Sequence, residues 1–330
     1  MKTRRLGQTD SRISAIGLGA MNISGFYGPA SEAEAFALFD RAVELGIDHL
    51  DTSNVYGNGH SEEVIGRYIA SRGPRFRIAT KAGICRDPET GTRYFDNSKA
   101  HLTAALDASL KRLGVEQVAL FYVHRREAER PIEDVTETLA GLKASGKIEA
   151  FGFSEIAPSS LDRAMAIHPV AAVQSEYSLA TRAPELGLVE ACARHGTSLV
   201  AFSPVGRAFL TDTPPDRARA EASAFLRANP RFQEPNLSAN LAATDRFRRA
   251  AARIGAPAAA VAIAWLLRKG KAVIPIPGTR NPGHLAEAAT GVSLNLGDDE
   301  TALIEEALPR GWAHGDRYND TQWTGPERYC

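Results

Sequence analysis

The chain has 330 residues, of which 44% are hydrophobic and 24% are charged, and its formal net charge is zero. This is ordinary globular composition with enough apolar residues to fill a core, and the length allows either two domains or one large barrel. The balanced charge excludes the strongly basic character of many proteins that bind nucleic acids or anionic membranes. No nucleic-acid partner and no membrane partner are therefore expected.

Targeting and metal-binding signals are also missing from the sequence. It contains no run of about 18 apolar residues, the length that predicts a membrane span. Met1-Lys-Thr-Arg-Arg leads into polar sequence instead of a signal-peptide core. The three cysteines, Cys85, Cys192 and Cys330, are widely scattered and lack the spacing of a metal site. These features favour a cytoplasmic protein without a bound metal.

Short apolar runs alternate with amphipathic segments along nearly the whole chain. Residues 2–14 are expected to form a small β-hairpin ahead of the first run. Eight strands are predicted at residues 15–19, 47–50, 76–80, 117–122, 147–153, 171–174, 198–202 and 272–276. The segments between them carry helix signals: Ser31 and Glu34 form a capping box, and Pro131 opens a stretch with apolar residues on one face.

Eight short strands, each followed by a helix, are typical of a (β/α)8 barrel, the TIM barrel fold of the α/β class. No internal repeat or low-complexity linker divides the chain, so residues 1–330 are predicted to form one domain. Residues 205–240 are too long for an ordinary connection between a strand and its helix, and they contain four prolines. We expect a long lid loop there, after the seventh strand, in preference to a disordered insertion.

Four residues with acid–base chemistry stand at the ends of three successive predicted strands. Asp51 and Tyr56 follow the second strand, Lys81 follows the third and His124 follows the fourth. In a (β/α)8 barrel these strand ends meet on the face that carries catalysis. Each residue alone has an ordinary explanation, as a turn residue, a packing aromatic, a surface cation or a structural histidine. The chain holds only eight lysines against 31 arginines, however, and the four residues in this order predict a proton-transfer site.

Three motifs of other enzyme classes are absent. Gly17-Leu-Gly19-Ala-Met-Asn22 begins like a dinucleotide fingerprint but lacks the third glycine. No tyrosine is followed four residues later by a lysine, so the short-chain dehydrogenase pair is missing. Gly152-Phe-Ser154-Glu-Ile lacks the second glycine of a nucleophile elbow. If a nicotinamide cofactor binds to this chain, it does so without a Rossmann domain.

Several further segments form a recognisable set with these strand ends. They are Gly17-Leu-Gly19-Ala-Met21, Asp51 to Gly57, Thr80-Lys81, Val123-His124-Arg125, Gly152-Phe-Ser154-Glu155, Gln174-Ser-Glu-Tyr177-Ser, Phe202-Ser-Pro-Val-Gly206-Arg207 and Ile274-Pro-Ile-Pro-Gly-Thr-Arg280. Together they resemble the aldo-keto reductases over nearly the full length of the chain. Pro230-Arg-Phe232 and Ser203-Pro204 are most similar to the bacterial and fungal branch that includes the pyridoxal reductases.

The resemblance implies that NADPH binds extended across the barrel mouth and that its hydride passes to an aldehyde or ketone. Tyr56 would be the general acid, and Lys81 is expected to lower the pKa of its phenol from the ordinary value of about 10. Asp51 would keep Lys81 charged and in place. His124 would donate a hydrogen bond from a neutral imidazole to the carbonyl oxygen.

The resemblance also implies a cofactor site. Ser154 and Gln174 would hold the nicotinamide carboxamide, and Phe202 would stack on the ring. Ser203 to Arg207 would follow the pyrophosphate beneath the lid. The full predicted set is Gly19, Ala20, Met21, Asp51, Ser154, Gln174, Phe202, Ser203, Pro204, Gly206, Arg207, Gly278, Thr279, Arg280, His284 and Glu287.

The adenine end of this site decides between the two nicotinamide cofactors. Arg280 would pair with the 2′-phosphate, which favours NADPH, with NADH as a secondary cofactor. Two positions depart from the family pattern: Ala288 stands where asparagine is usual, and His284 stands where arginine or glutamine is common. Dual use of NADPH and NADH is compatible with these departures.

The substrate pocket is predicted to contain Met21, Tyr27, Tyr56, His124, Arg125 and Tyr177. In the family a C-terminal tail folds over this pocket; here it is residues 308–330, with Trp312, Tyr318 and Trp323. An aromatic, mostly apolar wall favours an aromatic or hydrophobic carbonyl substrate. Arg125 could instead meet an anionic group or pair with a neighbouring acid. The oligomeric state is left open by the sequence.

Two other functions are alternatives to carbonyl reduction. The family includes channel β-subunits that keep the barrel but mainly bind a partner, through a large hydrophobic patch or an appended N-terminal segment. This chain starts almost at its predicted hairpin. A phosphate-binding barrel lyase or isomerase would need Lys81 as a Schiff-base nucleophile, whereas Asp51 and Tyr56 are placed to serve a phenol acid. Carbonyl reduction is therefore the preferred interpretation.

Overall fold

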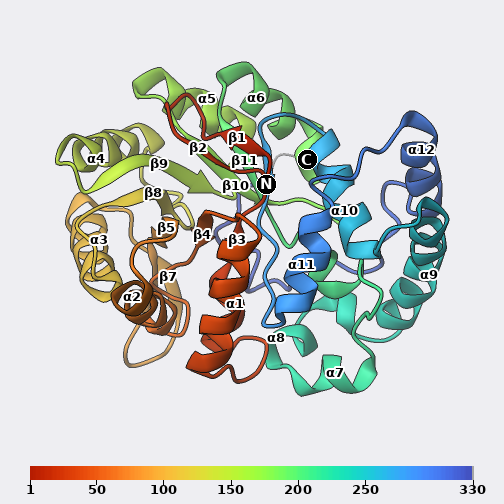
Figure 1. The fold of residues 1–330 in the computed structure, drawn as a ribbon. Coiled ribbons are helices and arrows are strands. Elements are labelled where there is room, and N and C mark those ends of the chain that lie inside the picture. The colour runs from red at the N-terminus through yellow and green to blue at the C-terminus, as the bar shows by residue number, and fades with distance from the viewer. Residues whose placement is uncertain (329–330) are drawn as a thin grey trace.

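Eight strands form one parallel sheet at the centre of the computed structural model, which describes residues 1–328 (Figure 1). They are β3 (Leu18–Gly19), β4 (His49–Asp51), β5 (Arg77–Ala82), β8 (Val118–Val123), β9 (Ile148–Ser154), β10 (Ala172–Glu176), β11 (Ser198–Phe202) and β12 (Val273–Pro275), each paired with the next. The N–H groups of Gly17 and Gly19 donate to the carbonyl oxygens of Pro275 and Pro277 at 2.9 and 3.0 Å. These bonds bring the last strand against the first, so the sheet curls round as in a (β/α)8 barrel. All eight predicted strands are present, with shifted ends.

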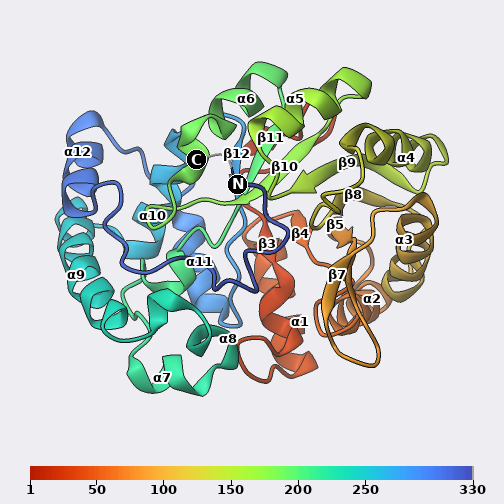
Figure 2. The same ribbon diagram turned by 180° about the vertical axis from the view of Figure 1, so that it is seen from behind.

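The helices that follow the strands cover the outside of the sheet (Figures 1 and 2). They are α1 (Glu32–Glu44), α2 (His60–Arg72), α3 (Lys99–Leu113), α4 (Ile132–Ala144), α5 (Pro158–Ile167), α6 (Leu188–His195), α10 (Ala258–Arg268) and α11 (Pro282–Thr290). At the start of α1 the Ser31 hydroxyl accepts from the Glu34 N–H at 3.2 Å, and the Glu34 carboxylate accepts from the Ser31 N–H at 2.8 Å. The predicted capping box is confirmed.

A β-hairpin covers the N-terminal end of the barrel. Strands β1 (Thr3–Arg5) and β2 (Arg12–Ser14) pair antiparallel, as the sequence predicts. Leu6 and Ile13 of this hairpin are buried in the hydrophobic cluster that fills the inside of the barrel. The barrel interior is thus a packed core, and its carboxyl end is left for a binding site.

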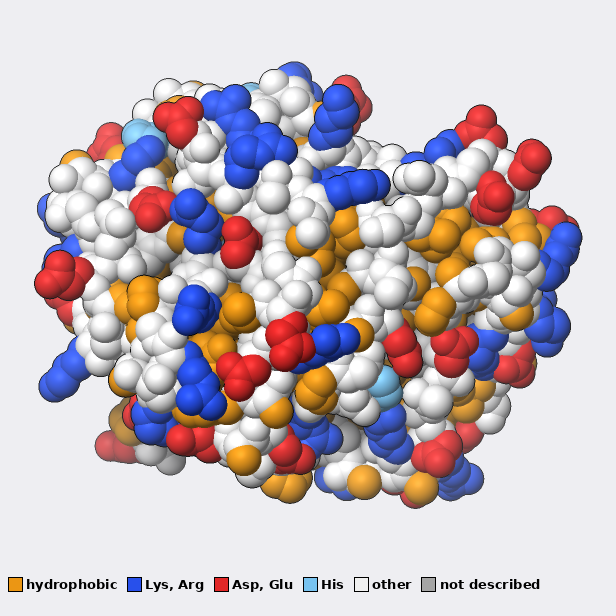
Figure 3. Space-filling model, viewed as in Figure 1, with side chains coloured by type: hydrophobic (Ala, Val, Ile, Leu, Met, Phe, Trp, Pro, Cys, Tyr) orange, Lys and Arg blue, Asp and Glu red, His pale blue; other side chains and the backbone are white. Residues whose placement is uncertain are grey.

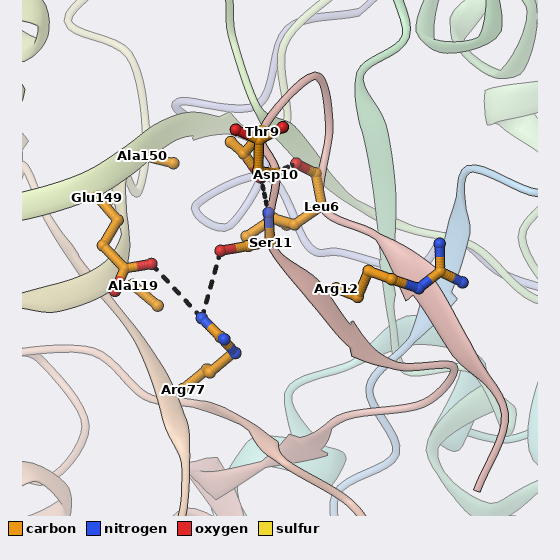
Figure 4. Close-up of a pocket in the computed structure, with 9 residues that line it drawn as sticks. All are labelled: Leu6, Thr9, Asp10, Ser11, Arg12, Arg77, Ala119, Glu149 and Ala150. Atoms are coloured by element: carbon orange, nitrogen blue, oxygen red, sulfur yellow. Dashed lines mark hydrogen bonds and ion pairs between the residues drawn. The ribbon is translucent and has the colours of Figure 1, made fainter.

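A hollow of about 430 Å³ lies beside this hairpin (Figure 4). Arg77 Nη1 donates to Ser11 Oγ at 3.3 Å and pairs with Glu149 at 3.6 Å. Both charged residues stand at the amino ends of their strands, away from the predicted proton-transfer site. Figure 3 shows side chains of both charge signs interspersed on one face of the molecule, in keeping with the zero net charge.

Two insertions interrupt the regular alternation of strands and helices. The first, β6 (Ile84–Arg86) and β7 (Arg93–Phe95), is a second hairpin after β5 that the sequence pattern does not predict. The second is the segment 205–240, which contains short helices and not one long loop. These are η3 (Gly206–Ala208), α7 (Arg217–Ala222), α8 (Ala224–Arg227), η4 (Pro230–Phe232) and the start of α9 (Asn236–Ile254).

The segment 205–240 is a small folded unit. The side chains of Asp216, Ser223 and Asn229 each accept a hydrogen bond from a backbone N–H at the start of one of its short helices. Phe209 and Phe232 stack at 4.5 Å within a hydrophobic cluster of their own. Local caps and this cluster explain why the segment is helical despite its prolines.

The C-terminal segment after α12 (Asp298–Ala307) crosses the carboxyl end of the barrel (Figure 2). Arg93 of β7 donates to two carbonyl oxygens of this segment, at 2.6 and 2.8 Å, and Arg207 donates to the carbonyl oxygen of Arg317 at 2.8 Å. These bonds hold the segment above the strand ends. The last two residues of the predicted tail, including Cys330, lie outside the described residues.

Helix length and composition bear on membrane insertion. Within residues 1–328 no single helix is long and apolar enough to cross a bilayer; α9 and α10 would meet the requirement only as a pair, and they are bent by 86°.

Gly7 in the hairpin turn provides a test of how closely the hairpin contacts the barrel. Its φ is +58°, and a Cβ atom there would lie 2.4 Å from the Ala171 carbonyl oxygen. Gly7→Ala should cost about 1–2 kcal/mol for the left-handed backbone and a further ~1–3 kcal/mol for overlap. Gly114→Ala is the matched control, because Gly114 is left-handed, with φ +67° and ψ 34°, and has no atom within 4 Å of its Cβ position. Equal losses of unfolding free energy in urea would contradict the close contact.

Candidate active site

Lys81 lies at the centre of the predicted proton-transfer group and is fully buried. Its Nζ donates to Asp51 Oδ1, to the Thr52 carbonyl oxygen at 2.7 Å and to the Tyr56 hydroxyl at 3.4 Å. The other Asp51 oxygen accepts from Gln174 Nε2 at 2.7 Å. These side chains meet because the strands that carry or precede them end at the same edge of the sheet. The structure thus brings Asp51, Tyr56 and Lys81 together.

Burial and charge act in opposite directions on this group. Burial disfavours the charged form of Lys81, but Asp51 and Tyr56 outweigh it, and the pKa of Lys81 is raised above its usual value. Burial raises the pKa of Tyr56 more than Lys81 lowers it, so that pKa lies above 10.0. The expectation that Lys81 brings the pKa of Tyr56 below the ordinary phenol value is therefore wrong, because desolvation is the larger effect. At pH 7 Lys81 is a cation and Tyr56 a neutral phenol.

His124 follows β8 at the same edge, with its ring centroid 5.9 Å from that of Tyr56. Burial, together with the positive charges of Arg125 and Lys81, holds the pKa of His124 well below 6.5, so its imidazole is neutral at pH 7. Its Nδ1 lies 3.1 Å from the hydroxyl of Ser53. When this hydroxyl donates to Nδ1, the ring proton is on Nε2, which is then a free donor. Ser53 was missed in the sequence, although it lies between Asp51 and Tyr56.

A cavity of about 1250 Å³ connects these residues with the segment between β12 and α11. The predicted site residues that line it are Gly19, Met21, Tyr27, Asp51, Tyr56, His124, Arg125, Ser154, Gln174, Phe202, Ser203, Pro204, Arg207, Gly278, Thr279, Arg280, His284 and Glu287. Ala20 and Gly206 are buried and do not line it. Most of the predicted set therefore surrounds one continuous space.

Tyr177 does not line the cavity, and its assignment to the substrate pocket is corrected. Its hydroxyl donates to Glu185 at 3.0 Å, and its ring packs edge-on against Trp265 at 5.8 Å. The side chain comes just after a strand end but turns toward the surrounding helices. Trp312 of the C-terminal segment is also buried elsewhere, and its indole N–H donates to a backbone carbonyl oxygen at 2.7 Å. From that segment, Tyr318 does line the cavity.

The far end of the cavity contains groups that favour an anionic ligand. Asn281 is the N-cap residue of α11, and a helix N-terminus favours anionic groups. A Cβ atom on Gly278 would lie 2.6 Å from Asn22 Oδ1, so the two loops approach as closely as only glycine allows. Arg280 lines the same end and donates to a backbone carbonyl oxygen. Together these residues offer N–H groups and a guanidinium to an anionic ligand.

The stretch after β11 combines strained backbone with a paired arginine. Ser203, Arg207 and Ala208 have φ values of 49°, 53° and 77°. Such left-handed conformations cost a non-glycine residue about 1–3 kcal/mol and often accompany binding sites. The Arg207 guanidinium, predicted to follow the pyrophosphate, donates to Glu176 at 2.8 Å. Its charge is therefore balanced within the protein.

Comparison with known proteins finds one family over most of the chain. The model of the Aldo/keto reductase family matches residues 15–309. Over 324 residues the chain is 37% identical to aldo-keto reductase yakc (NADP(+)) of Schizosaccharomyces pombe, which covers 96% of this chain and 94% of that protein. It is 34% identical over 317 residues to probable aldo-keto reductase 1 of Glycine max, covering 95% and 91%. The solved glycerol dehydrogenase AKR11B4 of Gluconobacter oxydans is similar with a TM-score of 0.82 and 28% identity, covering 96% and 98%.

The buried, neutral state of His124 predicts a pH-dependent stability. Because the pKa of His124 in the folded protein lies below 6.5, the unfolded chain binds more protons once the pH falls below that value. The stability associated with a neutral His124 is thus complete above pH 6.5. It is lost as the pH falls, by up to about 1.4 kcal/mol per pH unit.

His124→Gln should therefore reduce the loss of unfolding free energy between about pH 7.5 and about pH 5.5, measured by urea titration. His49 is also buried with a lowered pKa, so His49→Gln is a matched control that should act in the same direction. If His49→Gln flattens the pH dependence and His124→Gln leaves it unchanged, His124 is not the neutral buried group described above.

Proposed function

The chain belongs to the aldo/keto reductase family, and from this membership we propose that it reduces an aldehyde or ketone to an alcohol. NADPH is the proposed cofactor, with NADH as a secondary one. The observation that carries the proposal is the buried Lys81, which joins Asp51 to the Tyr56 hydroxyl at one end of a long cavity. The similarity to a relative named with NADP(+) supports the choice of cofactor.

Tyr56 is the proton donor in this proposal. The bound reduced nicotinamide supplies the hydride that reaches the carbonyl carbon. As negative charge develops on the carbonyl oxygen, the Tyr56 hydroxyl transfers its proton to that oxygen. Lys81 lies 3.4 Å from the hydroxyl and stabilises the phenolate, while Asp51 keeps Lys81 charged. His124 donates a hydrogen bond to the same carbonyl oxygen and orients it.

Ser154 and Gln174 have the free groups that a nicotinamide carboxamide needs. Gln174 uses an N–H on Asp51 at 2.7 Å, which leaves its side-chain oxygen as an acceptor. Ser154 Oγ accepts from Arg125 at 3.0 Å, which leaves its hydroxyl proton for donation. The pair can therefore bind both the N–H and the carbonyl of a carboxamide. Phe202 lines the same cavity and offers a phenyl ring for stacking.

The segment 205–240 is the proposed lid over the cofactor. Phe225 of α8 packs edge-on against Phe26 at 6.2 Å and against Tyr27 at 5.3 Å. Both partners follow η1 (Ala20–Ser24), so these contacts join the two sides of the cavity. The segment has a small hydrophobic cluster of its own, separate from the main core of the barrel.

The geometry disfavours the lyase alternative. A Schiff-base lysine must present a neutral amine with a free lone pair. Lys81 Nζ instead donates to three acceptors, and its pKa is raised above the usual value. Lys81 therefore suits a role as a fixed cation beside the phenol.

Tyr56→Phe should lower NADPH-dependent turnover of an activated aromatic aldehyde by about 100- to 10,000-fold, because the proton donor is removed. The loss of absorbance at 340 nm measures turnover, and quenching of protein fluorescence by NADPH should be unchanged. Tyr94→Phe is a matched control, since Tyr94 is 48% exposed and does not line the cavity. Wild-type turnover in Tyr56→Phe would exclude this residue as the acid.

Arg280→Ala should weaken the binding of NADPH by about 10- to 100-fold, the value of a charge-assisted hydrogen bond. NADH lacks the 2′-phosphate and should bind with nearly unchanged affinity, so it is the internal control. Dissociation constants from fluorescence titration of the same variant measure both effects. Equal weakening of the two cofactors would mean that the 2′-phosphate is contacted elsewhere.

A further inference from the structure

Arg125 differs from the other buried arginines. Within residues 1–328 three arginines are at most 9% exposed. Arg126 pairs with Glu327, and Arg317 pairs with Glu155. Arg125, at 8% exposed, forms no ion pair with any acid in this part of the chain. Burying a cation without a counter-ion costs several kcal/mol of desolvation free energy. The missing counter-ion of Arg125 therefore points to an anionic ligand.

The Arg125 guanidinium has donors left over for such a ligand. Nη1 donates to the His124 carbonyl oxygen at 2.6 Å and to Ser154 Oγ at 3.0 Å, and Nη2 makes only a 3.4 Å contact with the Tyr318 hydroxyl. Nε has no hydrogen-bond partner in residues 1–328, and the protein does not enclose it completely. Arg125 lines the same cavity as His124 and Tyr56, so a ligand in that cavity can reach these donors.

Among the described residues, the cavity wall around Arg125 contains further arginines and no unpaired carboxylate. Arg86 and Arg93 of the β6–β7 hairpin line the cavity, and neither forms an ion pair with an acid of residues 1–328. Burial and the nearby charge of Arg125 lower the pKa of Arg93, as expected for crowded like charges. The acids that line the cavity are Asp51, which Lys81 neutralises, and Glu287, which lies on α11 at the far end.

We propose that Arg125, in a cavity wall that also contains Arg93, binds a carboxylate of the substrate, so that acidic aldehydes or ketones are the preferred substrates. This inference rests on the proposed carbonyl reduction. A planar guanidinium pairs with a carboxylate through two parallel hydrogen bonds. Phe26 and Tyr56 pack edge-on at 6.3 Å in the same wall, which leaves apolar surface for the rest of the molecule. An aromatic or extended apolar acid that bears the carbonyl group satisfies both features.

The test compares 4-formylbenzoate with its neutral methyl ester and with 4-formylphenyl phosphate, using NADPH. Wild-type kcat/KM should be at least about 10-fold higher for the carboxylate than for the ester, through KM. Arg125→Gln should lower the ratio of kcat/KM for the carboxylate to kcat/KM for the ester by about 10- to 100-fold; loss of its hydrogen bond to Ser154 affects both substrates alike and cancels in this ratio. Arg125→Lys keeps the charge and should recover part of the preference, and Arg93→Gln should lower it by a smaller factor.

Two further measurements do not depend on the folding of an Arg125 variant. In the wild type at saturating NADPH, raising KCl from about 10 to about 300 mM should reduce kcat/KM for the carboxylate more than for the ester, because salt screens the approach of the anion to the positively charged wall. Calorimetry should show that 4-formylbenzoate binds more tightly than its methyl ester to the protein with NADP+, a combination that has no hydride to transfer and so does not react. Equal kcat/KM for acid and ester in the wild type would overturn the inference. A preference for the phosphate would overturn its assignment to carboxylates, and no reduction of any aldehyde would overturn the proposed function itself.

Discussion

The buried ion pair between Lys81 and Asp51 is the interaction on which the rest of the site depends. The two residues are 0% and 2% exposed, so each charge needs the other. Removing one partner of such a pair typically costs about 3–5 kcal/mol, because the remaining charge has no counter-ion and no water. The parallel register holds them: Asp51 of β4 lies opposite Ala79 of β5, and Lys81 follows two residues later. The pairing of β4 with β5 thus fixes the backbone positions of both charged residues.

The same burial changes how Tyr56 can work. A phenol with a raised pKa is a weaker acid in the resting protein. That would be adverse for a proton donor only if the resting state alone decided the rate of proton transfer. Once substrate and cofactor fill the cavity and displace water, however, the charge of Lys81 would be poorly screened and would stabilise the phenolate as it forms. Burial also holds His124 neutral, and a neutral imidazole can donate one hydrogen bond without adding a second cation beside Lys81. Desolvation therefore sets the protonation states of these residues, and in the proposed reaction the fixed cation would assist the proton transfer.

The sequence predicts the barrel and the proton-transfer group because both depend on local pattern. Each strand is a short apolar run, and the polar residue that ends it must lie at the mouth. The β6–β7 hairpin has no such run, since its strands carry Arg86 and Arg93, and its charged residues were missed. Tyr177 is the opposite case, a residue that was predicted in the site but lies outside it. It follows a strand end, but its packing against Trp265 turns its side chain away from the cavity, and the sequence pattern does not reveal that packing. The pKa of Tyr56 depends on burial, which spacing along the chain does not reveal.

The short helices of 205–240 were missed for a similar reason. Each is too brief to show a 3.6-residue apolar period, and its stability comes from caps and from the cluster around Phe209 and Phe232. Their location after the seventh strand was evident from length alone. The length of the segment does not reveal the contact of Phe225 with Tyr27. This contact joins two segments that are about 200 residues apart in the sequence.

Charge pairing at the barrel mouth separates structural arginines from one that is open to a ligand. Arg207 and Arg317 each meet a buried glutamate, Glu176 and Glu155, and so attach the insertion and the C-terminal segment to the ends of the central strands. Arg125 receives only a long contact from the C-terminal segment. A carboxylate bound there would reduce the positive potential around His124. Burial is nevertheless the largest cause of that residue's lowered pKa, so the imidazole stays neutral, and keeps its role as a donor, when the anion is in place.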